Sequence, residues 1–387
     1  MKKISLYIHV PFCKQKCFYC DFPSYAGKED LMDDYVDALI KEMHEKCKGY
    51  IIKTIFIGGG TPSYLSVDLI EKLLSEIKKL NLDTNIEFTV ECNPGVLFEE
   101  KLKVMKLGGV NRISFGLQSC NDNLLKKIGR IHTFDEFEEN FNTARRIGFN
   151  NINVDLMYGL PNLTVDIWRD TLEKICELKP EHISAYSLII EEGTAFYKMY
   201  EKNLLNLPSE DEEREMDKLT KDFLKSKGYN QYEVSNYALK GKECEHNKVY
   251  WKTEEYIGIG SSSSSYIDNF RVSNITSVKD YINNINTNKT VEEERYKNTR
   301  EDNIEEFIFM GLRMIKGINL QEFNRRFGVD ITSIYECQIE KNIRRGLLII
   351  KDGNLKLTEK GINLSNNVMS DFILDKQYRK SEQKGEN

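Results

Sequence analysis

The stretch ISLYIHVPFCKQKCFYC, residues 4–20, decides how the rest of the chain is interpreted. Its first seven residues alternate apolar and polar side chains, which predicts a β-strand over 4–10. Cys13, Cys17 and Cys20 follow directly in the spacing C-x3-C-x2-C. Three of the nine cysteines therefore gather in the loop after the first strand.

Strand-like and helix-like segments alternate through the first half of the chain. We expect strands at 4–10, 54–60, 86–92, 112–118, 152–159 and 182–190. Helical periodicity lies between them at 30–47, 67–80, 97–108, 134–148 and 165–179. This alternation predicts an α/β fold with an incomplete (βα)6 TIM-like barrel. A doubly wound sheet is the alternative, although no GxGxxG motif follows the first strand.

The inner faces of the predicted strands are polar or small. Alternation places Tyr7, Glu91, Gln118 and Asp155 on these faces. A barrel interior that is simply packed is filled with bulky branched residues. We therefore expect the interior to hold a polar ligand near the carboxyl ends of the strands. A sheet with one solvated face is the alternative, and it is less favoured because parallel sheets are normally covered on both faces.

The pattern changes after residue 195. We expect a helix at 208–228, a strand at 229–239 and a Gly/Ser loop at 258–269. Beyond residue 300, several helices and a hairpin with its turn at Asp352-Gly353 predict a small helical, winged-helix-like domain. The predicted division is a barrel domain at 1–240, a connecting segment at 241–299, a C-terminal helical domain at 300–375 and a disordered tail at 376–387.

Composition limits the partners and the compartment. The chain of 387 residues has a net charge of −6, so no basic surface indicates nucleic acid. The apolar run at the N-terminus is too short for a signal peptide or a membrane span. Nine irregularly spaced cysteines indicate a reducing compartment. We expect a cytoplasmic protein without a transmembrane segment.

The three clustered cysteines predict a metal centre. Thiolates are soft ligands that suit zinc or iron–sulfur clusters. Three cysteines on one loop can hold three irons of a [4Fe–4S] cluster and leave the fourth iron open to a ligand that is not protein. Zinc with His9 or Asp21 as fourth ligand, and chance clustering, are the alternatives. The other six cysteines are scattered and are interpreted as structural or incidental.

With this motif in the first βα loop, the chain resembles the radical S-adenosylmethionine (SAM) superfamily. Within it, one branch contains oxygen-independent coproporphyrinogen III oxidase and a paralogous haem chaperone. The motifs that resemble this branch are GGGTPSYL (58–65), ECNPG (91–95), SFGLQS (114–119), NVDLMYGLP (153–161) and EEFIFMGLRMIKGI (305–318). In the superfamily, SAM chelates the open iron and is cleaved by an electron from the cluster to give a 5′-deoxyadenosyl radical.

The resemblance implies roles for individual residues. Cys13, Cys17 and Cys20 would bind the cluster. The SAM-contacting positions would be Tyr7, Tyr19, Gly59, Gly60, Thr61, Glu91, Gln118, Arg130 and Asp155. The residues themselves are compatible with this, because consecutive glycines let the backbone approach a ligand closely. No Lys-Ser/Thr follows the glycines, which excludes a nucleotide P-loop.

Three features favour the chaperone over the oxidase. The resemblance implies a further cysteine in the oxidase two residues after the third cysteine, and this chain has Phe22 at that position. We also expect the N-terminal extension of the oxidase to be absent. HNKVYW (246–251) resembles a motif associated with haem binding in the chaperone, which makes His246 and Tyr250 candidate haem ligands. The loop GIGSSSSSY (258–266) is a departure from the pattern of this branch, because it lacks the histidine that is usual there.

The implied function is therefore a protein that binds a [4Fe–4S] cluster, SAM and haem. It would deliver haem to haem-requiring client proteins, such as respiratory enzymes. Radical oxidative decarboxylation of coproporphyrinogen III to protoporphyrinogen IX is the alternative.

Overall fold

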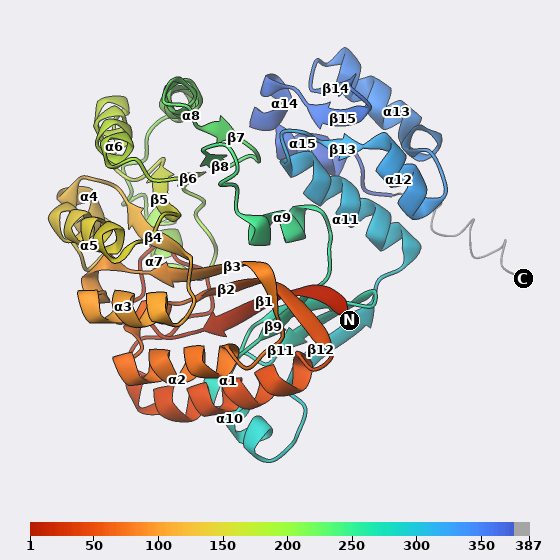
Figure 1. The fold of residues 1–387 in the computed structure, drawn as a ribbon. Helices are drawn as coiled ribbons and strands as arrows, with labels where there is room; N and C mark the ends of the chain where they lie inside the picture. Colours follow the sequence, from red (N-terminus) through yellow and green to blue (C-terminus); the bar gives the residue numbers. More distant parts are fainter. Residues whose placement is uncertain (375–387) are drawn as a thin grey trace, which may run out of the picture.

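The computed structural model describes residues 1–374, and the predicted tail at 376–387 lies outside the described residues (Figure 1). Its centre is a parallel sheet in which six strands lie side by side in chain order. They are β1 (Lys2–Val10), β2 (Tyr50–Gly59), β3 (Leu82–Cys92), β4 (Arg112–Gln118), β5 (Ile152–Tyr158) and β6 (His182–Ser187). This sequential order confirms the incomplete barrel, because a doubly wound sheet reverses its strand order.

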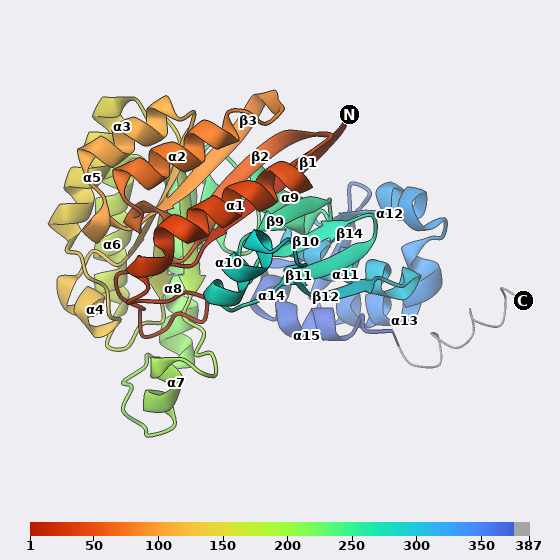
Figure 2. The ribbon, with the colours of Figure 1, turned by 90° about the horizontal axis from the view of Figure 1, so that it is seen from below.

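Helices cover the outer side of this sheet (Figures 1 and 2). The predicted ones are α1 (Met32–Lys46), α2 (Val67–Ile77), α3 (Glu99–Leu107), α5 (Phe134–Ile147), α6 (Val165–Leu178) and α8 (Glu210–Ser226). Two short helices, α4 (Asp122–Lys127) and α7 (Ala195–Tyr200), were not predicted. Capping fixes the boundaries: α5 begins at a capping box of Thr133 and Glu136 and ends at Gly148, whose φ is 98°.

The two faces of the barrel strands differ as alternation predicts. On β1, Ile4, Leu6 and Ile8 are fully buried in the core under the helices. The intervening Ser5 accepts a hydrogen bond from Thr54 of β2, at 2.8 Å between the hydroxyl oxygens. The barrel interior therefore contains polar side chains that satisfy one another.

The sheet continues beyond the barrel strands on both edges. β9 (Tyr256–Ile259) pairs parallel with β1 and is followed by β10 (Ser264–Ile267), β11 (Phe270–Asn274) and β12 (Glu292–Lys297). The far edge is formed by β8 (Asn236–Ala238) and β7 (Asn230–Gln231). The helix α10 (Val278–Asn286) packs against α1. The division of the chain at residue 240 stays a prediction, although β9–β12 extend the barrel sheet.

Two local predictions in this region were wrong. The expected Gly/Ser loop at 258–269 contains parts of β9 and β10, because Gly258 lets the two strands approach. A Cβ on Gly258 would lie 2.0 Å from the backbone oxygen of Ser264. The expected strand at 229–239 is interrupted, and its two halves form the short antiparallel pair β7 and β8.

The C-terminal residues form a separate core. Its elements are α11 (Arg300–Arg313), β13 (Ile318–Asn319), α12 (Leu320–Phe327), α13 (Ile331–Arg344), β14 (Leu348–Lys351), β15 (Asn354–Leu357), α14 (Glu359–Asn363) and α15 (Ser365–Ser370). The hairpin turn is at Asp352 and Gly353 as predicted, with φ of 52° and 72°. The helix α9 (Glu245–Trp251) lies between the barrel and α11 (Figure 1). Within residues 1–374, no helix has the length and apolar character needed to cross a bilayer.

Candidate cluster and SAM site

The cysteine loop lies at the carboxyl end of β1 and is held from both sides. The backbone of Cys13 donates a hydrogen bond to the carbonyl of Tyr25, at 3.0 Å, and that of Phe18 to the carbonyl of Ile128, also at 3.0 Å. Cys13 is buried, whereas Cys17 and Cys20 are partly exposed, and all three are free thiols. The backbone thus fixes a loop that presents three sulfurs at the mouth of the barrel.

The three thiols are a donor set that a [4Fe–4S] cluster can use. In the described part of the chain, no three His, Cys, Asp or Glu side chains converge as they would around one ion. In a [4Fe–4S] cluster each thiolate binds a different iron, so the sulfurs do not need to converge on one point. The ring nitrogens of His9 are engaged by Tyr7 at 3.0 Å and by the Pro23 carbonyl at 2.9 Å. Asp21 is exposed.

The glycine-rich loop after β2 packs directly against the cysteine loop. The backbone of Gly60 donates to the carbonyl of Val10 and that of Thr61 to the carbonyl of Phe12, both at 2.8 Å. The Thr61 hydroxyl lies 3.4 Å from the sulfur of Cys13. A Cβ on Gly60 would lie 2.8 Å from the Phe12 oxygen, so only glycine allows this approach.

Two acidic side chains, one from β3 and one from β5, face the interior of the barrel. Glu91 of β3 accepts a hydrogen bond from the backbone of Gly59 at 3.2 Å. Asp155 of β5 accepts from the Asn153 amide at 2.7 Å. Burial, with the charge of Asp155, raises the pKa of Glu91 to about 8. Burial also raises the pKa of Asp155. Such a pair is suited to accept hydrogen bonds from ligand hydroxyls or from an ammonium group.

Arg130, Tyr19 and Gln118 complete the predicted SAM set around the loop. Arg130 donates to the Cys17 sulfur at 3.6 Å and to the carbonyl of Gly116. Tyr19 lies beside both Cys17 and Arg130. In the described residues, Gln118 Oε1 and Arg130 Nε are buried without a hydrogen-bond partner. Unsatisfied buried polar atoms beside three thiols fit a site that takes a further polar ligand.

Comparisons with known proteins agree with this geometry. Residues 7–175 match the family model of the Radical SAM superfamily, and residues 298–364 match that of the HemN C-terminal domain. A relative from Lactococcus lactis named "Heme chaperone HemW" is 41% identical, over 97% of this chain and 98% of its own length. A protein of the same name from Bacillus subtilis is 38% identical, over 95% and 99%.

The chain belongs to the HemW family of radical SAM proteins. The resemblance read from the sequence motifs is thereby confirmed. The solved structure of coproporphyrinogen III oxidase (HemN) from Escherichia coli superposes with a TM-score of 0.85, over 96% of this chain and 90% of that one. At 23% identity this match shows that the two proteins share a fold.

In this HemW-family chain, His246 and Tyr250 lie away from the cysteine loop. His246 is fully buried on α9, with Nδ1 2.8 Å from the Thr54 hydroxyl and Nε2 2.9 Å from the Tyr250 hydroxyl. Thr54 is five residues before the end of β2, which is roughly 16 Å along the strand. Burial lowers the pKa of His246 to about 3, so the ring is neutral.

Both ring nitrogens of His246 are therefore already hydrogen-bonded, at the end of the barrel opposite the cysteine loop, which we call the barrel floor. The ring also stacks on Phe56, with centroids 5.3 Å apart. Ligation of haem iron by His246 stays a prediction, and it requires that one of the two hydrogen bonds be released. Tyr250 is subject to the same condition, because its hydroxyl is one of the two partners.

Sequence reasoning missed the residues that fix α9 in place. Glu87 of β3 accepts hydrogen bonds from the backbone of Glu245 at 3.0 Å and of His246 at 2.9 Å. Arg112, at the start of β4, is 1% exposed. It lies near Glu87 and Asp155, whose negative charges help to raise the pKa of its guanidinium group. The alternation of β3 put Glu87 on the inner face, and this was the available signal. Arg112 carried no such signal, because a lone arginine at a strand end is normally exposed.

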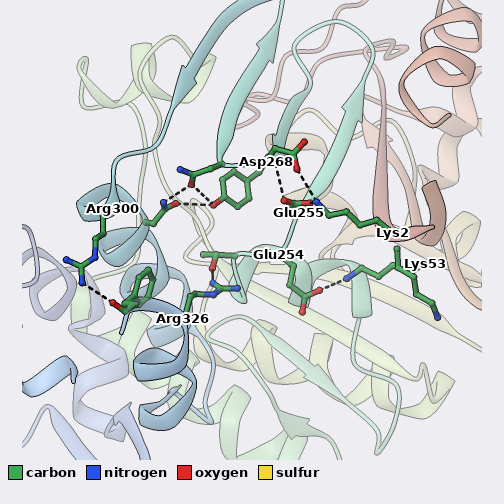
Figure 3. Close-up of a pocket in the computed structure, with 13 residues that line it drawn as sticks. Lys2, Lys53, Glu254, Glu255, Asp268, Arg300 and Arg326 are labelled. Atoms are coloured by element: carbon green, nitrogen blue, oxygen red, sulfur yellow. Dashed lines mark hydrogen bonds and ion pairs between the residues drawn. The ribbon is translucent and has the colours of Figure 1, made fainter. Parts of the chain in front are cut away.

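A separate hollow of about 770 Å³ lies outside the barrel, between the start of β1, the β10–β11 turn and the C-terminal helices (Figure 3). Its labelled charges are largely paired with one another. Lys2 contacts Glu255 and Asp268, and Lys53 contacts Glu254. None of the predicted cluster, SAM or haem residues lines it. The candidate site is therefore the mouth of the barrel.

Proposed function

We propose that this protein is a radical SAM haem chaperone. It holds a [4Fe–4S] cluster through Cys13, Cys17 and Cys20, binds SAM beside that cluster, takes up haem and delivers it to haem-requiring proteins. The observation that carries the proposal is near full-length similarity to relatives named heme chaperone, in a chain whose three-cysteine loop lies at a polar barrel mouth.

The residues of the mouth have distinct proposed roles. When bound, the cluster supplies an electron and one iron open to the amino and carboxylate groups of SAM. Arg130, beside Cys17, offsets the negative charge of a thiolate. Thr61 holds the sulfur of Cys13 in place and limits its contact with water. Glu91 and Asp155 accept hydrogen bonds from the polar groups of SAM, and Gln118 and Arg130 offer their unsatisfied atoms to it.

The oxidase is the less supported alternative. At the position where the oxidase pattern has a further cysteine, this chain has Phe22, which is 62% exposed on the cysteine loop. A thiol there would add a donor close to the three cluster ligands. Its absence, together with the names of the relatives, favours haem delivery over porphyrinogen oxidation.

The proposal is tested by anaerobic reconstitution followed by two parallel assays. The reconstituted protein is titrated with haem while the Soret band is followed, and it is incubated with coproporphyrinogen III, SAM and a reductant. We expect saturable haem binding without turnover of the porphyrinogen. Sustained formation of protoporphyrinogen would assign the oxidase function instead. A Cys13→Ser, Cys17→Ser, Cys20→Ser triple variant is the control without a cluster.

A further inference from the structure

Lys101 is a buried ammonium group on the inner side of α3. Its residue is 5% exposed, although the helix lies on the outside of the barrel. No acidic side chain of the described residues neutralises it, and Nζ lies 4.6 Å from the centre of the Phe98 ring. Burial lowers the pKa of Lys101 to about 8. A lysine in such surroundings is unusual, because an unpaired buried charge destabilises the fold.

The ammonium group is hydrogen-bonded to two loops of the barrel mouth. Nζ donates to the carbonyl of Ser63 at 2.7 Å and to the carbonyl of Val96 at 3.1 Å. Ser63 lies in the 3-10 turn Pro62–Tyr64, directly after the glycine-rich stretch. Val96 lies in the 3-10 turn Pro94–Val96, shortly after Glu91. One side chain thus connects the loop after β2 with the loop after β3.

A second contact joins the same two loops. The hydroxyl of Ser63 accepts a hydrogen bond from the backbone of Asn93 at 3.0 Å. These loops carry part of the predicted SAM set: Gly59, Gly60 and Thr61 on one side and Glu91 on the other. Binding one ligand from both sides requires a fixed spacing between them. A flexible ammonium group with three donors can satisfy two carbonyls that point from different turns.

We propose that Lys101 is a positioning residue for SAM, which sets the spacing between the glycine-rich loop and the Glu91 loop. This inference rests on the proposed function, because it assumes that the barrel mouth binds SAM. In this proposal, Lys101 itself does not contact SAM. It acts through the two carbonyls that it holds.

The test compares Lys101→Met with Lys106→Met in the full-length, reconstituted protein. Lys106 is on the same helix, donates to the Gly148 carbonyl at 2.8 Å and lies 4.9 Å over the Phe149 ring. Both variants therefore lose a similar set of contacts, but only the first loses contacts to the mouth. SAM affinity is measured by equilibrium binding and by the change that SAM causes in the electron paramagnetic resonance signal of the reduced cluster.

We expect Lys101→Met to weaken SAM binding at least tenfold, with iron content unchanged, and to show the spectral change only at correspondingly higher SAM concentrations. Lys106→Met should keep the affinity of the parent. A parent-like affinity for Lys101→Met would overturn the inference. If that variant does not fold, Lys101→Gln decides, because it keeps a hydrogen-bond donor on a shorter, uncharged side chain: a several-fold loss supports the inference, and an unchanged affinity overturns it. Failure of the parent itself to bind SAM would instead reject the proposed function.

Discussion

The hydroxyl of Thr61 lies 3.4 Å from the sulfur of Cys13, so the loop after β2 touches the cysteine loop after β1. Gly60 makes this contact possible, because any larger residue would collide with the backbone of the cysteine loop. The two most distinctive motifs of the sequence, C-x3-C-x2-C and GGGTP, thus form one surface.

Each of the three clustered cysteines should be required for the cluster. We expect Cys13→Ser, Cys17→Ser and Cys20→Ser each to reduce iron and sulfide content after anaerobic reconstitution to near background. Cys337→Ser is the matched control, because Cys337 is an exposed free thiol on α13. Iron analysis and visible absorption measure the outcome. Full cluster content in any one of the three variants would show that another side chain is the ligand.

Glu91 should make the ligand-free protein less stable as the pH rises. Burial, with the charge of Asp155, raises the pKa of this carboxyl from 4.5 to about 8. The folded state then binds more protons than the unfolded state between these values, so the free energy of unfolding falls as pH increases through this range.

Glu91→Gln removes this dependence, and we expect the variant to exceed the parent in stability at about pH 9 by roughly 4 kcal/mol. At about pH 4 the two should be closer, because Glu91 is protonated in both the folded and the unfolded parent. Urea denaturation at both pH values is the measurement, with the exposed Glu99→Gln as control. Identical pH dependence in parent and Glu91→Gln would contradict the assigned environment. Above about pH 8, where the parent's Glu91 is ionised, the same variant should also bind SAM more weakly, because it lacks the carboxylate acceptor.

His246 should contribute to stability whether or not it binds haem. His246→Ala removes hydrogen bonds to Thr54 and Tyr250 and the stacking on Phe56, and we expect a loss of about 2–4 kcal/mol in the free energy of unfolding. The cluster should stay intact. His44→Ala on α1 is the control, because the His44 side chain is 40% exposed.

Haem titration of the same variants tests the predicted ligand role of His246. If His246 binds the iron, His246→Ala weakens the Soret titration, whereas Thr54→Val frees the ring nitrogen and keeps haem binding. Equal titrations for His246→Ala and the parent would remove His246 from the haem site. Equal losses in both variants would indicate that only the integrity of the barrel floor matters.

Glu42 should hold the GIGSSSSSY segment against α1. Its buried carboxylate accepts hydrogen bonds from the Gly260 backbone at 2.8 Å, from the Asn274 amide at 2.7 Å and from the Tyr281 hydroxyl. We expect Glu42→Ala to lower the free energy of unfolding by about 3 kcal/mol, because several buried donors lose their acceptor. Glu45→Ala, exposed on the same helix, should be neutral. Hydrogen exchange at Gly260 and urea denaturation measure the effect, and equal stability of the two variants would contradict it.

The elements that sequence patterns predicted well are those whose signals are local. β4 was predicted at its observed bounds, 112–118, because Ile113, Phe115 and Leu117 alternate with polar or small residues. The turn at Asp352-Gly353 was correct because both residues favour a positive φ. Tyr7, Glu91 and Asp155 were placed on the inner faces by the same two-residue period.

The elements that were missed depend on contacts between distant residues. The strands within 258–269 form because Gly258 packs against Ser264 and because Glu42, more than two hundred residues earlier, fixes Gly260. The occupied state of His246 depends on Thr54, a residue from β2 that no motif connects with HNKVYW. Lys101 was not singled out from the sequence, because the two carbonyls that it binds cannot be located from its own segment.

The most direct test of the central claim is Mössbauer and electron paramagnetic resonance spectroscopy of the anaerobically reconstituted protein, with and without SAM. The account predicts a [4Fe–4S] cluster with three cysteine ligands and one distinct iron, whose spectrum changes when SAM is added. A cluster with four protein ligands, or a spectrum that does not respond to SAM, would contradict it.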